Sequence, residues 1–261
     1  MEVLYGLHPV EEAIRSGSRR LDHVSVARER RDERLERLIQ LCRTAGVRVS
    51  LESRDQLTKL ARSDAHQGVL AVVKEREFLG IEDLLLPKGP GEYQFLLALD
   101  GVEDPHNLGA LLRTADGAGV DGVILPERRA AGVTATVAKT SAGASEHVRI
   151  ARVTNLVRSL EQLKQKNMWV LGLDERGSPD YVDFDFKTDC VLVLGREGAG
   201  LHDLVKKTCD HLLRIPMAGM VSSLNVSVAG AIVMYEAMRQ RRPAVESKPE
   251  KATKVRKGLG S

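Results

Sequence analysis

Between residues 95 and 215, short apolar runs alternate with helical patterns, and this alternation constrains the fold more than any other feature of the sequence. We expect the apolar runs to be strands, at residues 95–99, 122–125, 169–173, 191–194 and 212–215. Helical patterns lie between them, at 108–118, 133–143, 156–166 and 201–209. Strands that are apolar throughout are typical of parallel sheets covered on both faces. The pattern therefore predicts an α/β fold with a mostly parallel open sheet.

A cluster of Pro and Gly at residues 87–91 divides the chain, and we expect residues 75–93 to be a linker. Residues 1–74 have a pattern of their own, which predicts a small α/β domain. Its expected elements are helices at 10–14, 30–45 and 56–62 and strands at 24–27, 47–51 and 69–73. The second domain is expected at 94–243. Residues 244–261 are rich in Lys and poor in apolar residues, so we expect a disordered basic tail.

Composition excludes several classes of protein. No apolar run approaches the roughly 20 residues of a membrane span, and the acidic N-terminus does not resemble a signal peptide. The three cysteines, Cys42, Cys190 and Cys209, are far apart and lack the CxxC spacing of a zinc site. We therefore expect reduced thiols, no metal, no membrane and a cytoplasmic location.

The distribution of charge favours a nucleic-acid partner. Residues 239–261 carry 8 Lys and Arg against 2 acids, and residues 1–76 carry 15 against 12. Residues 77–238 carry 16 against 22. Basic end segments on an acidic body often contact nucleic acid, although a solvated surface is the simpler alternative.

The first expected strand runs into an acidic turn, LDGVEDPHNLG at residues 99–109. Asn107 can cap the helix that follows. Arg113 then interrupts a helix face of small residues, which leaves two interpretations open. It is either an ordinary surface residue or a guanidinium directed at a phosphate.

A glycine-rich turn, LGREGAGL at residues 194–201, follows the fourth expected strand. Its glycines allow a close approach of the backbone to a ligand. Their order is G-x-x-G-x-G, whereas the dinucleotide fingerprint is G-x-G-x-x-G. A nicotinamide cofactor is therefore disfavoured.

The segment IPMAGMVSSLNVSVAGA, residues 215–231, holds more small polar residues than a helix cap requires. The helix expected after Asn225 carries no charge before Glu236. Such a helix is buried in a core or against a partner. The segment predicts either a ligand-binding corner or an ordinary capped core helix.

Taken together, the motifs at 104–119, 192–201 and 215–231 resemble those of the SpoU/TrmH family of RNA ribose 2′-O-methyltransferases, within the SPOUT superfamily. The motifs LYGLHPVEEA at residue 4 and HQGV at residue 66 resemble the small RNA-binding domain of one branch of that family. This branch methylates a guanosine ribose in the peptidyl-transferase loop of 23S rRNA.

The resemblance implies a C-terminal SPOUT domain with a deep trefoil knot, an exception to unknotted connectivity. It also implies a homodimer, S-adenosylmethionine as methyl donor, and no metal. Backbone groups at Gly195, Ile215 and Leu224 would hold the adenine and ribose, and Thr140 would line the same pocket.

The family treats the position of Arg113 as catalytic. A guanidinium remains protonated at neutral pH, so orientation of the ribose hydroxyl and stabilisation of the alkoxide are easier roles than proton removal. The resemblance implies that Glu197 and Asn225 position Arg113 and the RNA. Asn107 and Ser223 would support the pocket or a substrate phosphate.

Three alternatives remain from sequence. The enzyme could modify a tRNA ribose, or it could methylate rRNA to confer antibiotic resistance. A non-catalytic RNA-binding protein with the same domains is the third, and retained binding of S-adenosylmethionine would discriminate against it.

Overall fold

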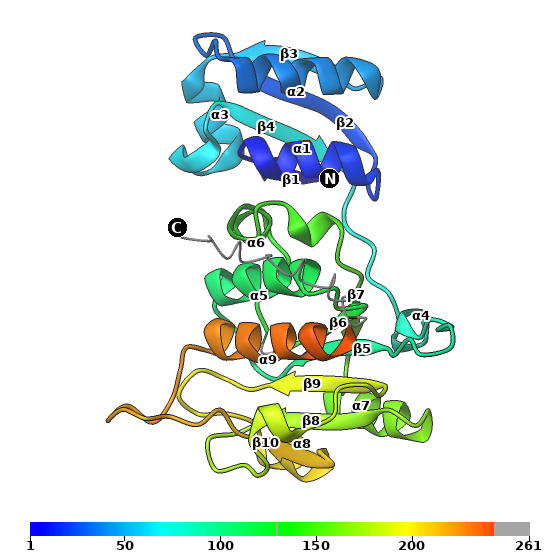
Figure 1. The fold of residues 1–261 in the computed structure, drawn as a ribbon. Coiled ribbons are helices and arrows are strands. Elements are labelled where there is room, and N and C mark those ends of the chain that lie inside the picture. Colours follow the sequence, from blue (N-terminus) through cyan, green and yellow to red (C-terminus); the bar gives the residue numbers. More distant parts are fainter. Residues whose placement is uncertain (129, 243–261) are drawn as a thin grey trace, which may run out of the picture.

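The computed structural model describes residues 1–128 and 130–242, which form two α/β units (Figure 1). The expected basic tail at 244–261 lies outside the described residues. No helix in the described part of the chain is long and apolar enough to cross a bilayer.

The N-terminal unit has a four-stranded sheet in the order β1-β4-β2-β3. Its strands are β1 (Glu2–Tyr5), β2 (Leu21–Ala27), β3 (Arg48–Glu52) and β4 (Val69–Val73). Its helices are α1 (Leu7–Ser16), α2 (Glu33–Thr44) and α3 (Arg54–Ala61), followed by the 3₁₀ turn η1 (Asp64–His66). Strand β4 runs antiparallel to β1 and β2, and β2 runs parallel to β3.

The core of this unit follows from its amphipathic helices. Leu35, Leu38 and Cys42 repeat at helical spacing on α2 and are buried together with the apolar face of α1. Leu57 of α3 packs with Leu70 in a smaller cluster. The sequence patterns predicted this unit except for β1, which is only four residues long.

The C-terminal unit has six parallel strands in the order β10-β8-β9-β5-β6-β7. They are β5 (Phe95–Leu99), β6 (Gly122–Pro126), β7 (Ile150–Val153), β8 (Trp169–Leu173), β9 (Cys190–Leu194) and β10 (His211–Leu213). The helices are α4 (Ile81–Leu84), α5 (Pro105–Gly117), α6 (Ala135–Thr140), α7 (Leu156–Gln165), α8 (Asp203–Thr208) and α9 (Val226–Arg241). The 3₁₀ turns are η2 (Ala144–Glu146) and η3 (Tyr181–Asp183). The predicted parallel sheet is thus confirmed, with β7 as an additional strand.

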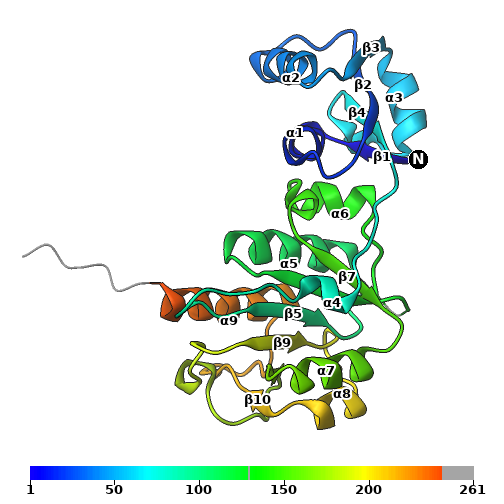
Figure 2. The ribbon, with the colours of Figure 1, turned by 90° about the vertical axis from the view of Figure 1, so that its right-hand side faces the viewer.

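Alternate side chains of each strand enter two separate cores, because successive residues of a strand point to opposite faces. On β5, Leu97 and Leu99 join the core beneath α5 and α9, whereas Leu96 and Ala98 join the core beneath α7 and α8. Figure 2 shows these helix pairs on opposite sides of the strands. All four of these side chains are fully buried, and a buried Leu contributes about 1.5–3 kcal/mol.

The strand order places a topological switch point between β5 and β9. From β5 the chain proceeds through α5 to β6 on one side, and from β9 it proceeds through α8 towards β10 on the other. Ligands of open α/β sheets bind outside the carboxyl ends of strands at such a point. The loops after β5 and β9 are therefore the expected position of a site.

The expected linker at 75–93 contributes to the core of the C-terminal unit. Leu79 extends the edge of β7, because its N–H donates to the Ile150 carbonyl at 3.0 Å and its carbonyl accepts from Arg152 N at 3.1 Å. Leu84 of α4 is fully buried beside the strands. The first half of the segment is therefore partly packed on the C-terminal unit, whereas residues 86–93 are exposed.

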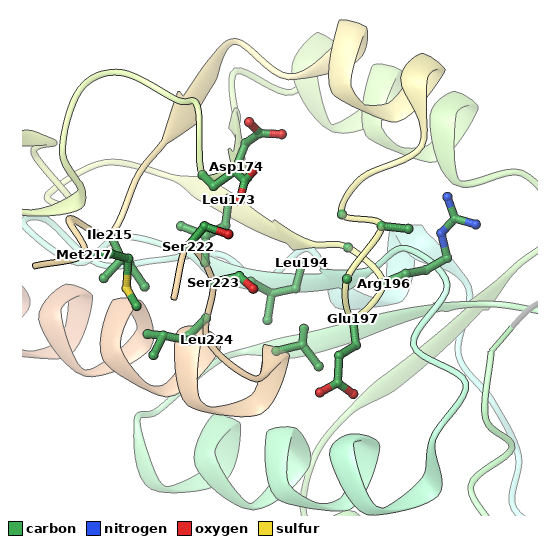
Figure 3. Close-up of a pocket in the computed structure, with 17 residues that line it drawn as sticks. Leu173, Asp174, Leu194, Arg196, Glu197, Ile215, Met217, Ser222, Ser223 and Leu224 are labelled. Atoms are coloured by element: carbon green, nitrogen blue, oxygen red, sulfur yellow. The ribbon is translucent and has the colours of Figure 1, made fainter. Parts of the chain in front are cut away.

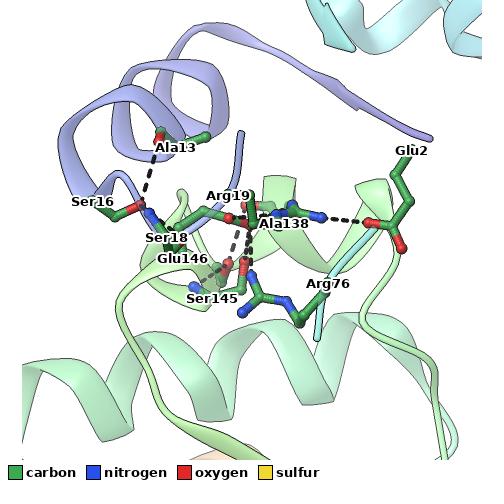
Figure 4. A network of polar contacts seen from close by, with 10 residues as sticks. Glu2, Ala13, Ser16, Ser18, Arg19, Arg76, Ala138, Ser145 and Glu146 are labelled. Atoms are coloured by element: carbon green, nitrogen blue, oxygen red, sulfur yellow. Dashed lines mark hydrogen bonds and ion pairs between the residues drawn. The ribbon is translucent and has the colours of Figure 1, made fainter. Parts of the chain in front are cut away.

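The two units meet around the buried carboxylate of Glu146 (Figure 4). Its oxygens accept from Arg19 Nη2 at 2.8 Å, from Arg19 Nε at 3.0 Å and from Arg76 Nη2 at 2.8 Å. Arg19 also pairs with Glu2. All of Glu146, Arg19 and Arg76 have side chains at most 9% exposed. One carboxylate of the C-terminal unit thus holds two guanidinium groups from the preceding segment of the chain.

We predict that Glu146→Gln will destabilise the protein by about 3 kcal/mol or more, because it leaves two buried guanidinium groups without their shared counter-charge. Urea unfolding measures the loss. Glu12→Gln is the matched control, since Glu12 bridges the same units through His147 at 2.7 Å but is partly exposed; its loss should remain below about 1 kcal/mol. Equal losses in the two variants would contradict the role of Glu146.

Candidate active site

A cavity of about 310 Å³ lies at the carboxyl ends of β8, β9 and β10 (Figure 3). This volume is at the lower end of the range for small-molecule sites, roughly 300–1,000 Å³. The wall combines the ends of these strands with the segment that enters α9. Its members are Leu173, Asp174, Glu175, Leu194–Gly200, Ile215, Met217, Ser222–Leu224, Val226 and Ala229.

The cavity combines an apolar wall with carboxylates. Leu194, Leu224 and Val226 supply apolar surface, and Asp174, Glu175 and Glu197 supply acidic groups. Arg196 also lies in the wall, but Figure 3 shows its guanidinium pointing away from the cavity. This arrangement suits a ligand with a flat apolar part and a positive charge.

The turn after β9 is closed on itself. Arg196 and Gly200 exchange backbone hydrogen bonds at 3.0 and 2.9 Å. A Cβ added at Gly195 would lie 2.3 Å from the Gly200 carbonyl carbon, a distance that no side chain tolerates. From sequence, the glycines of this turn are expected to let the backbone approach a ligand closely. At Gly195 the close approach is instead that of the turn to its own backbone.

Asp174 follows β8 and is held ionised beside the cavity. Burial alone would raise the pKa of Asp174, but hydrogen bonds from Lys206 Nζ at 2.7 Å and from Arg176 N at 3.0 Å outweigh it. The net effect is a pKa below the ordinary value. A negative charge therefore remains at this edge of the cavity at neutral pH.

Three predicted residues meet in one hydrogen-bonded cluster. Asn107 Nδ2 donates to Glu197 Oε2 at 3.1 Å, and Asn225 Nδ2 donates to Asn107 Oδ1 at 3.0 Å and to Glu197 Oε1 at 3.2 Å. In Figure 3 the Glu197 side chain extends from the turn towards α5. The cluster joins the segments after β5, after β9 and before α9.

The expectation that Asn107 caps its helix is wrong. Helix α5 begins three residues earlier than expected, at Pro105, and Asp104 caps it by accepting from His106 N at 3.0 Å. Pro is favoured in the first turn because it has no N–H to satisfy. Asn107 is therefore inside the helix, where its buried side chain is available to Glu197.

Arg113 lies on the exposed side of α5. Six residues separate it from Asn107, which places the two side chains about 120° apart around the helix. Its side chain makes no hydrogen bond or ion pair with any described residue. Glu197 and Asn225 therefore bond each other and Asn107, and neither bonds Arg113. It also lies outside the cavity wall.

The other predicted residues take two different positions. Gly195, Ile215, Ser223 and Leu224 all line the cavity. Thr140 does not, because its hydroxyl bonds the Thr136 carbonyl at 2.9 Å and the Pro105 carbonyl at 3.3 Å. It thus joins α6 to the start of α5.

Helix α9 is buried on one face only. Asn225 caps it by accepting from Ser227 N at 2.9 Å. Val233, Met234 and Ala237 are fully buried, whereas Val228 and Tyr235 are each 48% exposed. The chain by itself therefore leaves part of this apolar helix uncovered.

Two acidic residues at strand ends are not among the site residues predicted from sequence. Asp174 directly follows β8, and Asp100 directly follows β5. Asp100 accepts from His202 N at 2.7 Å and contacts His202 Nδ1 at 2.8 Å, which joins β5 to the start of α8. Both could have been found from sequence, because ligands of open α/β sheets bind at the carboxyl ends of the strands.

The three cysteines, Cys42, Cys190 and Cys209, are free thiols. Burial raises the pKa of Cys42 to about 11, and it raises the pKa of Cys190 and Cys209 to about 12. Such thiols are unreactive at neutral pH.

Comparison with known proteins agrees with this geometry. Residues 94–235 match the SpoU rRNA Methylase family, and residues 3–79 match the family described as RNA 2′-O ribose methyltransferase substrate binding. The 23S rRNA (guanosine-2′-O-)-methyltransferase RlmB of Bordetella pertussis is 43% identical over 92% of this chain and 98% of its own. The putative TrmH family tRNA/rRNA methyltransferase YacO of Bacillus subtilis is 41% identical over 94% and 98%.

A solved structure has the same two-unit architecture. The SpoU methyltransferase AviRb from Streptomyces viridochromogenes, crystallised with AdoMet, is 27% identical and superposes with a TM-score of 0.76 over 92% of this chain and 90% of its own. A family match over more than half of the chain, together with relatives above 40% identity over nearly all of it, establishes the assignment. The chain belongs to the SpoU rRNA methylase family.

Proposed function

We propose that the protein transfers a methyl group from S-adenosylmethionine to the ribose 2′-OH of a guanosine in 23S rRNA. The observation that carries this proposal is the cavity at the strand ends, which is bordered by the cluster of Asn107, Glu197 and Asn225. The relatives named for this reaction align over nearly their whole length, which supports the same substrate.

The cavity fits S-adenosylmethionine. Its apolar wall at Leu194, Leu224 and Val226 suits an adenine, and ionised Asp174 suits ribose hydroxyls or a cationic group. S-adenosylmethionine supplies an electrophilic methyl group, so the chemistry needs no metal. We assign backbone groups at Gly195, Ile215 and Leu224 to its adenosine. Thr140 supports the site from outside by fixing the start of α5.

The protein's task is then to align the ribose hydroxyl and to stabilise its negative charge. Arg113 is exposed and without a bonding partner among the described residues, so it is available to a substrate. We assign it to orienting the hydroxyl. Glu197 and Asn225 act through Asn107, which they hold near the start of α5, the helix that carries Arg113. Asn107 and Ser223 support the pocket or a phosphate. The family's trefoil knot would hold the three loops together.

We propose a homodimer that covers α9. Val228 and Tyr235 are seven residues apart and so lie on the same stripe of the helix, where both are half exposed. The same helix borders the cavity through Val226 and Ala229. A second copy packed on this stripe would bury apolar surface directly behind the site, and an rRNA substrate would place the dimer in the cytoplasm.

The central prediction is that the purified protein, given S-adenosylmethionine and 23S rRNA, will add one 2′-O-methyl group to a guanosine. Mass-spectrometric mapping of ribose methylation measures the product. Arg113→Ala should abolish transfer in a single turnover while it leaves the affinity for S-adenosylmethionine nearly unchanged, because Arg113 lies outside the cavity. Methylation of tRNA but not of 23S rRNA would contradict the proposed substrate and favour the tRNA branch. RNA binding without any methylation would favour a non-catalytic binding protein.

A second prediction concerns Asn225→Asp. The new carboxylate can still cap α9, but it cannot donate to Asn107 or Glu197 and it repels Glu197. We expect the turnover number to fall by about 100-fold or more with the helical content unchanged. Asn155→Asp is the matched control, because Asn155 caps α7 after β7, at the opposite edge of the sheet from the strands that end at the cavity. Normal turnover of Asn225→Asp would show that the cluster has no part in the reaction.

A third prediction concerns Val228→Asp. A charge on the exposed stripe of α9 costs little in a monomer, but it is buried without a partner in the proposed dimer. Light scattering should therefore report a folded monomer, and calorimetric titration should report weaker binding of S-adenosylmethionine. Val182→Asp is the matched control, because Val182 is 49% exposed but lies in η3 and not on α9. A Val228→Asp dimer with normal affinity would refute the interface.

A further inference from the structure

Two sequence motifs of the N-terminal unit meet at a pocket that the proposed reaction does not use. Gly6-Leu7-His8 begins α1, and His66-Gln67-Gly68 precedes β4. Leu7, His8, Gln67 and Gly68 line a cavity of about 500 Å³. The rest of its wall comes from the end of β2 and from the starts of α2 and α3, and comprises Ala27, Glu29, Arg30, Arg34 and Arg54.

The floor of this pocket is rigid. His66 is fully buried, and its Nδ1 accepts from Gly68 N at 2.9 Å while its Nε2 contacts Thr58 Oγ1 at 3.0 Å. Gln67 Oε1 accepts from Leu7 N at 3.3 Å. Gly68 has φ of +73°, and a Cβ there would come within 3.1 Å of Ala27 Cβ. The turn is thus tied to α1, α3 and β2 without any ligand.

Three arginines contribute to the wall of the pocket. Arg30 is engaged within the protein, because its guanidinium bonds Asp32 Oδ2 at 2.6 Å and the Gln67 carbonyl. Arg34 and Arg54 are both exposed, and neither forms an ion pair with any described residue. Glu29 is the acidic member of the wall. Two uncommitted guanidinium groups therefore border a preformed hollow, which suits phosphate oxygens.

A short path of packed residues connects this pocket to the proposed active site. Lys139 of α6 donates to the Ala65 carbonyl at 2.8 Å, directly before the His66 turn. The next residue, Thr140, contacts the Pro105 carbonyl at the start of α5, two residues before Asn107. The starts of α1 and α9 also lie on the same side of the molecule, at the left of Figure 1. One strand of RNA can therefore follow this side of both units.

We propose that Arg34 and Arg54 bind backbone phosphates of the RNA substrate at this pocket and so direct the strand across α6 to the start of α5. This inference rests on the proposed function in one respect, because the RNA that binds here is the RNA that accepts the methyl group. Phosphate contacts fix the register of a nucleic acid on a protein, and they carry no base specificity.

The test measures binding of a labelled RNA fragment that carries the peptidyl-transferase loop of 23S rRNA, by fluorescence anisotropy at several salt concentrations. The variant is Arg34→Ala with Arg54→Ala. The control is Arg37→Ala with Arg43→Ala, which removes the same charge from the same unit but from a different groove on α2. Both variants leave the cavity for S-adenosylmethionine intact.

We expect the Arg34/Arg54 variant to bind this RNA about 10-fold more weakly and to lose roughly 1.5 from the slope of log K against log salt, because two phosphate contacts are lost. The control should lose less than half as much on both measures. KM for RNA should rise while the turnover number at saturating RNA is kept. Arg34→Lys with Arg54→Lys should recover much of the salt slope, since a lysine still binds phosphate as a point charge.

Equal losses in the variant and its control would overturn the assignment of this pocket, as would failure of the wild-type protein to bind the fragment. If the wild-type protein methylates the rRNA but the Arg34/Arg54 variant and the Arg37/Arg43 control bind RNA equally well, this inference is refuted and the proposed function is not. A protein that binds the RNA through Arg34 and Arg54 but transfers no methyl group refutes the proposed function alone.

Discussion

The pairing of β5 with β9 is the contact on which the rest of the catalytic unit depends. These two strands lie at the centre of the sheet and are hydrogen-bonded in register from Phe95 opposite Cys190 to Leu99 opposite Leu194. Beyond Leu99, Asp100 N donates to the Leu194 carbonyl at 2.7 Å, and the Asp100 carboxylate then bonds the His202 backbone. The two loops at the switch point therefore leave the sheet from fixed positions, and a shift of either strand by one residue would exchange the two cores.

The parallel sheet was predictable because its strands are apolar on both faces, as in Phe95–Leu99 and Cys190–Leu194. Strand β7 was missed because Arg152, exposed at an edge strand, interrupts its apolar run. The start of α5 was placed too late because Asn107 is a favourable cap, although Asp104 with Pro105 is a better one. Two favourable caps lie three residues apart here, and the later one was chosen.

The site could be predicted only as a set of segments. The sequence identified the turn at 194–201 and the segment at 215–231, and both line the cavity. It could not show that Glu197 and Asn225 would bond each other through Asn107, or that Thr140 would face α5, because these facts depend on the directions of side chains from four different elements. The sequence left open whether Arg113 is exposed, and the structure shows that it is, because α5 buries the face that carries Leu108, Leu111 and Ala115 against the sheet and α9.

Asn225 performs two tasks, since its oxygen caps α9 while its amide nitrogen bonds Asn107 and Glu197. Residues 107 and 197 cannot be joined in this way until residue 225 and the helix behind it are in place. In chain order, α9 follows all ten strands, so the cluster of Asn107, Glu197 and Asn225 is completed only after both sheets have been synthesised. A chain truncated before residue 225 would therefore hold every strand of both sheets and still lack the bonds that join residues 107 and 197 to the start of α9.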